Sequence, residues 1–184
     1  MANVKKYLFT ALTLGLIAAG GALLIGLTNW ATYKQIDQNK IAKKQTGVRK
    51  IYKNDNATYE TIDDKLKDKL KEKTKNTLNT LREYYLIKNN KDELGHAFLA
   101  EGSNSYGKIS LLIGFDTNDY YIGVYAITNE QTYKPTLETN YIKKINDTPE
   151  KLDDISVKCG ATYGATTVKT MIDQAKAYLQ KRKA

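Results

Sequence analysis

The sequence predicts an α+β protein, in which an N-terminal transmembrane helix precedes a domain built on an antiparallel sheet with flanking helices. Three patterns lead to this prediction. A long apolar run without charge opens the chain, four short segments rich in β-branched and aromatic residues occupy its middle, and an amphipathic segment closes it. Turn residues separate the four middle segments, which indicates consecutive antiparallel strands.

The apolar run is long enough to cross a bilayer. No charged residue occurs from Tyr7 to Tyr33, and about 20 apolar residues span the ~30 Å hydrocarbon core. Trp30 and Tyr33 lie at its end, where aromatic rings suit the membrane interface. A cleaved signal peptide is the alternative, but its apolar region is usually only about 7–15 residues long. We therefore expect residues 1–33 to form an uncleaved membrane anchor.

A stripe of small residues lies on one face of the expected membrane helix, at Ala18, Ala22 and Gly26. This spacing lets a second transmembrane helix approach closely. Small residues are also common in membrane helices that have no such partner. The stripe is therefore compatible with a helical membrane partner and equally with ordinary composition.

Charge and composition narrow the class of function. The chain has 29 Lys and Arg against 20 Asp and Glu, a net charge of +9. No arginine-rich block, zinc-finger spacing or basic–aromatic repeat accompanies that charge, which argues against a nucleic-acid partner. The single cysteine, Cys159, excludes an intrachain disulfide, and the single histidine, His96, argues against a metal site.

The remaining elements follow from local patterns. Residues 34–83 are charged and are expected to form a juxtamembrane segment, with a helix from Thr61, as its N-cap, to about Glu83. The last helix is expected at Thr166–Lys183, with basic residues in its final turn. The four strands are expected at residues 84–88, 95–99, 108–115 and 120–127. Residues 84–184 would thus form one domain.

The segment before the last helix has the chemistry of a phosphate site. Gly160 permits an unusual backbone turn, and Ala161 adds little bulk, so that the hydroxyl of Thr162 can project outward. Amides at the start of the following helix, near Thr166 and Thr167, are expected to face the same space. The positive end of a helix dipole favours a phosphate there.

At these residues the sequence resembles a known family. Gly160-Ala161-Thr162-Tyr163, followed by apolar residues on the last helix, is similar to the Ser/Thr-Gly-Ala-Thr motif of the FMN-binding domain. That domain occurs in the G subunit of the Rnf electron-transport complex and in the C subunit of the sodium-pumping NADH:quinone reductase. The resemblance also covers the anchor and most of residues 84–184, including Gly95-His96-Ala97-Phe98 and the hairpin around residues 109–124.

The resemblance implies a function for the motif. In that family a flavin transferase joins the phosphate of FMN to the last threonine of the motif, which corresponds to Thr162. It implies an electron-transfer subunit of an oxidoreductase complex, with covalent FMN, an extracytoplasmic C-terminal domain, and integral membrane redox subunits and the flavin transferase as partners. Thr162 would be an attachment point and not a catalytic residue. The residues implied around the flavin are Thr162, Gly160, Ala161, Tyr163, Cys159, Glu130 and Thr132.

Several positions depart from the family pattern. Cys159 stands where the family has Ser or Thr, Ser156 stands where it usually has Asp, and Gly164-Ala165 replaces a Thr-Ser pair. The second Gly-Ala-Thr run offers Thr166 as an alternative acceptor. Two other functions therefore stay open: a flavin-free interaction subunit of such a complex, and a pilin-like surface protein, since pilins also combine an apolar N-terminal helix with an antiparallel sheet.

Overall fold

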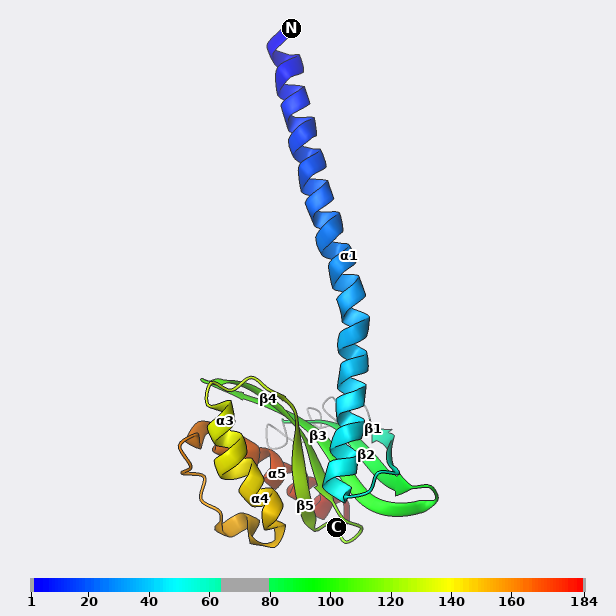
Figure 1. The fold of residues 1–184 in the computed structure, drawn as a ribbon, viewed down its shortest axis with the longest axis vertical. Coiled ribbons are helices and arrows are strands. Elements are labelled where there is room, and N and C mark those ends of the chain that lie inside the picture. Colours follow the sequence, from blue (N-terminus) through cyan, green and yellow to red (C-terminus); the bar gives the residue numbers. More distant parts are fainter. Residues whose placement is uncertain (1, 64–79, 184) are drawn as a thin grey trace. The chain divides into compact units, whose positions relative to one another are not determined.

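The computed structural model describes residues 2–63 and 80–183, and the chain divides into two compact units, Met1–Ala42 and Lys43–Ala184. Helix α1, Ala2–Tyr52, supplies the first unit and contributes its last turns to the second (Figure 1). All of the described strands belong to the second unit. The sequence segment 34–83 is thus shared between the two units, because its later part supplies elements of the globular one.

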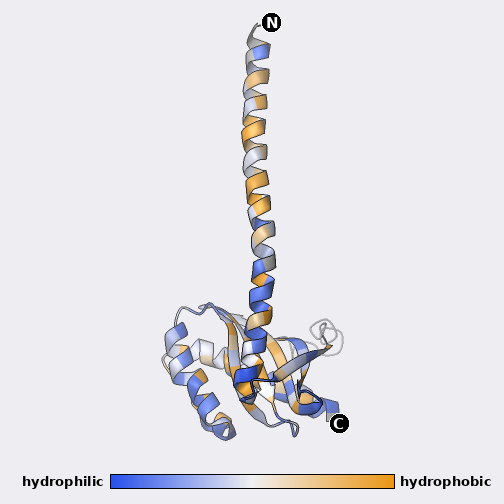
Figure 2. Ribbon diagram, turned by 45° about the vertical axis from the view of Figure 1, so that its right-hand side comes forward, coloured by the Kyte–Doolittle hydropathy of each residue, from blue (hydrophilic) through white to orange (hydrophobic). Residues whose placement is uncertain are grey.

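The N-terminal part of α1 is long and apolar enough to cross a membrane. Its large apolar side chains are exposed, and Figure 2 shows hydrophobic residues concentrated in this part of the helix. The hydroxyls of Thr13, Thr28 and Thr32 each donate to the carbonyl four residues earlier, at 2.7–2.8 Å. These donors are therefore satisfied inside the helix without water, as an apolar medium requires. The prediction of one membrane-length apolar helix is confirmed.

Helix α1 continues well past the apolar run, to Tyr52. No proline interrupts it, and its last turns are held by packing, since Val48 and Ile51 are buried against the sheet. The helix ends where Lys53 takes a positive φ of 49° and the amide of Asn54 donates to the carbonyl of Arg49.

The globular unit contains a five-stranded antiparallel sheet in the order β1-β2-β3-β4-β5. All four predicted strands are present, with ends that lie no more than five residues from the predicted ones, and a fifth strand precedes them. A turn follows β4, as the turn residues between the predicted strands indicate. Oδ1 of Asp116 accepts from the amides of Asn118 and Tyr120 in this turn. The strands are β1 (Ala57–Asp63), β2 (Leu81–Asn89), β3 (Asp92–Asn104), β4 (Gly107–Phe115) and β5 (Tyr121–Asn129).

The helix predicted from Thr61 to Glu83 is wrong at both of its ends. Thr61 lies in β1 opposite Tyr85, and Glu83 lies in β2 opposite Leu99. Cross-strand pairing explains the difference, because the rings of Tyr59 and Tyr85 meet edge to face at 5.1 Å and outweigh a local capping signature. The middle of the predicted helix, residues 64–79, lies outside the described residues.

The sheet is covered on both faces, because alternate residues of each strand point to opposite sides. On one face, the strands pack with helix α5 (Thr162–Lys183) and the short helices that precede it; on the other they pack with the last turns of α1 (Figure 1). Neighbouring residues of β3 illustrate the alternation, since Phe98 belongs to the first core and Leu99 to the second. The helices after β5 are α3 (Lys134–Leu137), η1 (Glu138–Ile142), α4 (Lys143–Asp147), η2 (Pro149–Asp154) and α5 (Thr162–Lys183).

The last helix begins four residues earlier than the sequence predicts. Thr162 is the first residue of α5, and the amide of Ala165 already donates to the carbonyl of Ala161. Burial explains the earlier start, because Ala161, Ala165 and Val168 form a helical stripe in the core. The expectation that the amides of Thr166 and Thr167 begin the helix is therefore wrong; those of residues 162–164 occupy that position.

Candidate functional site

The turn before α5 is held in place by the neighbouring helices. Gly160 has a φ of +86°, a conformation that favours glycine, and a Cβ on it would lie 3.2 Å from Cγ2 of Thr136. Four residues after Thr136, Nδ2 of Asn140 donates to the carbonyl of Cys159 at 3.0 Å. These contacts fix the direction in which the chain enters α5. The prediction that Gly160 adopts an unusual backbone turn is confirmed.

Thr162 is exposed on this turn and lines a pocket of about 250 Å³. Tyr163 is exposed beside it, whereas Ala161 is buried. The pocket also draws residues from the β3–β4 turn and from the loop that follows β5. Its lining residues are Tyr106, Gln131, Tyr133, Leu137, Gly160, Ala161, Thr162, Tyr163 and Gly164.

The pocket lies at the N-terminus of a 22-residue helix. The first amides of a helix lack acceptors within it and carry the positive end of its dipole. The first turn of α5 contains no acidic residue. An anion attached to Thr162 would therefore meet the positive end of the helix dipole, with no carboxylate in the first turn of α5 to oppose it.

Neither loop residue expected near the flavin, Glu130 or Thr132, lines this pocket; Gln131 and Tyr133 of the same loop line it instead. Thr132 instead links the loop after β5 to the turn between β3 and β4. Its amide and its hydroxyl both donate to the carbonyl of Tyr106, at 2.9 and 3.2 Å. Glu130 lines a different cavity, together with the alternative acceptor Thr166. The structure therefore groups Gly160 to Tyr163 in one pocket but assigns Glu130 to another.

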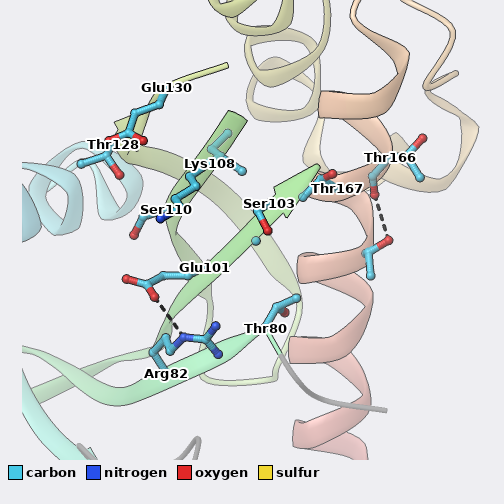
Figure 3. Close-up of a pocket in the computed structure, with 13 residues that line it drawn as sticks. Thr80, Arg82, Glu101, Ser103, Lys108, Ser110, Thr128, Glu130, Thr166 and Thr167 are labelled. Atoms are coloured by element: carbon cyan, nitrogen blue, oxygen red, sulfur yellow. Dashed lines mark hydrogen bonds and ion pairs between the residues drawn. The ribbon is translucent and has the colours of Figure 1, made fainter. Parts of the chain in front are cut away.

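That second cavity, of about 600 Å³, is polar and carries both signs of charge (Figure 3). Nε of Arg82 donates to Glu101 at 3.0 Å, and Lys108 and Glu130 add one charge of each sign. The charged residues that line this cavity are thus two of each sign. Its other lining residues are mainly hydroxyl-bearing: Thr80, Ser103, Ser110, Thr128, Thr166, Thr167 and Thr170.

The departures from the family motif have structural partners. Oγ of Ser156 accepts from the amide of Lys158 at 3.1 Å, and half-buried Cys159 packs against the core next to α5.

Nζ of Lys169 lies 3.0 Å from Asp153 and 3.8 Å from Asp173. The hydrogen bond from Lys169 to Asp153 lowers the pKa of that carboxyl. The ammonium group of Lys169 is therefore paired with two carboxylates.

The residues missed by sequence reasoning come from two distant loops. Gln131 is only 6% exposed, and its Nε2 donates to the carbonyl of Gly107, which ties the exit of β5 to the start of β4. Tyr106 and Tyr133 occupy the same two loops. No local pattern marks these residues, because the strand register alone brings them to α5.

Comparison with models of protein families finds no match to this chain, and comparison with curated proteins finds none either. Among the described residues, no group of three or more His, Cys, Asp or Glu side chains is arranged to hold a metal ion.

Proposed function

We propose that this chain is a single-pass membrane-anchored electron-transfer flavoprotein, which carries FMN as a phosphoester on Thr162 and serves an Rnf-like redox complex. The observation that carries the proposal is the position of Thr162. It is the exposed first residue of a long helix, it follows a glycine of positive φ, and it lines a pocket framed by tyrosines.

The residues around Thr162 fit a flavin phosphate. Gly160 and Ala161 leave the hydroxyl accessible to a transferase, because neither adds a side chain of any size beside it. The amides of the first turn of α5 would hold the anionic phosphoester, and Tyr106, Tyr133 and Tyr163 offer aromatic surface for a flat ring. Bound FMN would supply the redox chemistry, while the protein would hold and orient it.

Attachment would be a phosphoryl transfer. FMN alone would have to lose water to form the diester, so the donor must be an activated flavin nucleotide of the dinucleotide pyrophosphate class. Oγ1 of Thr162 forms a bond to the phosphorus on the flavin side, the pyrophosphate bond breaks, and a nucleoside monophosphate leaves. The hydroxyl proton passes to a base of the transferase, and no atom changes oxidation state.

The membrane assignment follows from α1. Its apolar part is long enough to span a bilayer and its side chains there are exposed. We place the globular unit outside the cytoplasm by the resemblance of the motif. A covalent link has a physical advantage there, because a flavin released from the protein would diffuse away.

The test is flavin attachment to full-length protein co-expressed with a flavin transferase. We expect the wild-type chain to fluoresce as a flavin in a denaturing gel and to gain the mass of FMN less one water. Thr162→Ala should lose both signals, whereas Thr162→Ser should keep them because it retains a hydroxyl. Thr166→Ala is the matched control and should be labelled like the wild type.

Two results would contradict the proposal. Labelling that persists in Thr162→Ala but disappears in Thr166→Ala would move the flavin to the polar cavity. Wild-type protein isolated from its own host as the bare polypeptide would favour the second candidate, a flavin-free interaction subunit. The departures at Ser156 and Cys159 are the observations that favour that candidate.

A further inference from the structure

Three tyrosines gather around Thr162 from three separate parts of the chain. Tyr106 lies in the turn between β3 and β4, Tyr133 in the loop after β5, and Tyr163 is the second residue of α5. The ring centroids of Tyr106 and Tyr133 are 5.5 Å apart, and those of Tyr106 and Tyr163 are 5.4 Å apart. We call these three side chains the tyrosine cluster.

The tyrosine cluster is unusually exposed for aromatic side chains in contact with one another. Tyr106 is 38% exposed, Tyr133 50% and Tyr163 62%. In the described part of the globular unit, the only other exposed large apolar side chains are Ile62 and Tyr120. Exposed apolar surface gathered in one place commonly marks a binding site.

The rings of the tyrosine cluster do not stack on one another. Their planes meet at 62° and 45°, whereas Tyr84 and Phe98 in the core lie 4.7 Å apart with an angle of 21°. Tilted and edge-to-face neighbours leave ring faces available to a further flat ring. The cluster therefore leaves a ring face open on which one further flat ring could stack.

The loops that carry the tyrosine cluster are joined by hydrogen bonds. The carbonyl of Tyr106 accepts from Thr132, and its amide donates to Oδ1 of Asn104 at 2.8 Å. Nδ2 of Asn104 in turn donates to Oγ1 of Thr167 on α5 at 3.0 Å. The three chain segments that carry the rings are thus joined before any ligand binds, which lowers the entropic cost of binding.

We infer that the tyrosine cluster is the platform on which the isoalloxazine ring of the Thr162-linked flavin stacks. The inference rests on the proposed function, since it assumes that FMN is attached to Thr162. The ribityl phosphate chain brings the ring into the pocket that the tyrosines and Thr162 line together. The tyrosine ring that stacks on the flavin shields one of its faces from water, and the other two rings contact its edges and hold it in position.

The test uses flavin emission from full-length flavinylated protein. A tyrosine in contact with an excited flavin quenches its emission by reversible electron donation. We expect weak emission from the folded wild type and a several-fold rise when it is unfolded in denaturant. In the triple variant Tyr106→Leu, Tyr133→Leu, Tyr163→Leu, emission of the folded protein should rise to nearly the unfolded level.

Two variants separate stacking from a general structural effect. The triple Tyr→Phe variant keeps flat rings that are harder to oxidise, so its flavin should stay immobile by fluorescence anisotropy while its emission rises. Tyr120→Leu removes an exposed tyrosine outside the cluster and should leave emission and anisotropy unchanged.

The outcomes distinguish this inference from the proposed function. Wild-type protein that carries the FMN mass but emits equally before and after unfolding overturns the tyrosine platform and leaves the flavoprotein proposal standing. Loss of quenching in Tyr120→Leu to the same extent as in the triple Leu variant also overturns it. Absence of the FMN mass from the wild type defeats the proposed function, and the platform with it.

Discussion

At the scale of single residues, the buried tyrosines differ in whether their hydroxyls are satisfied. The Tyr84 hydroxyl is bonded to Nδ1 of His96 at 3.0 Å and also accepts from Arg182. The Tyr141 side chain is fully buried, and its hydroxyl has no hydrogen-bond partner among the described residues. An unsatisfied buried polar group costs about 1–3 kcal/mol.

This difference predicts opposite effects for the same substitution. Tyr141→Phe removes a group that has lost its water, so it should leave the free energy of unfolding unchanged or raise it by about 1 kcal/mol. Tyr84→Phe should lower it by about 1 kcal/mol, since two polar partners lose their bond. Urea unfolding followed by tyrosine circular dichroism measures both, and a marked loss of stability in Tyr141→Phe would contradict the prediction.

Alkaline pH should act through the same hydroxyl. Burial raises the pKa of Tyr141 from 10.0 to about 12. Because the folded state favours the neutral hydroxyl, the raised pKa adds to the free energy of unfolding. This added stability is fully present below pH 10 and is lost as the pH rises towards 12. The melting temperature of Tyr141→Phe should therefore fall less steeply than that of the wild type over that interval. Parallel curves for the two proteins would contradict the prediction.

At the scale of elements, the sequence predicts the strands and turns that depend on local residue patterns. It does not predict the elements that depend on contacts with distant parts of the chain. The four later strands follow from alternation and turn residues such as Asp116. The sequence does not predict β1, because β1 is stabilised by pairing with β2. Nor does it predict the last turns of α1, which are stabilised by packing on the sheet. At the site, the turn at Gly160 is visible in the sequence, whereas Tyr106 and Tyr133 reach it only through the strand register.

Gly95 lies in β3 where the backbone of that strand closely approaches β4. It has a φ of +138° beside a register shift between β2 and β3. A Cβ on Gly95 would lie 2.1 Å from the carbonyl oxygen of Phe115, which also accepts from the hydroxyl of Tyr52 at 2.9 Å. That carbonyl is held by other contacts and cannot move aside easily.

Gly95→Ala should therefore lower the free energy of unfolding by about 3 kcal/mol or more, through backbone strain and the collision. Gly160→Ala is the comparison, because its φ is also positive but the nearest atom to a new Cβ is a side-chain methyl at 3.2 Å. We expect it to cost only about 1–2 kcal/mol. Urea unfolding of both variants gives the two values, and an equal cost would show that the carbonyl contact adds nothing.

At the scale of the whole molecule, the N-terminal boundary of the globular unit lies inside α1, at Lys43. The unit from Lys43 onward retains Val48 and Ile51 in the second core, and it retains the ion pair between Lys44 and Glu83 at 2.9 Å. Removal of the last turns of α1 would expose the apolar residues that they cover. Those residues of the sheet are Tyr85, Ile87, Ala97, Leu99, Leu112 and Ile127.

We expect the fragment 43–184 to be soluble and to unfold cooperatively, and the fragment 56–184 to aggregate or to bind a hydrophobic dye. Within the fragment 43–184, Val48→Asn should cost about 2–4 kcal/mol because it buries a polar group in an apolar core. The adjacent Arg49→Asn changes an exposed residue and should cost less than about 1 kcal/mol. Size-exclusion chromatography and thermal unfolding test these values. A monomeric, cooperatively folded fragment 56–184 would show that the sheet does not need α1, and α1 would then be only a tether.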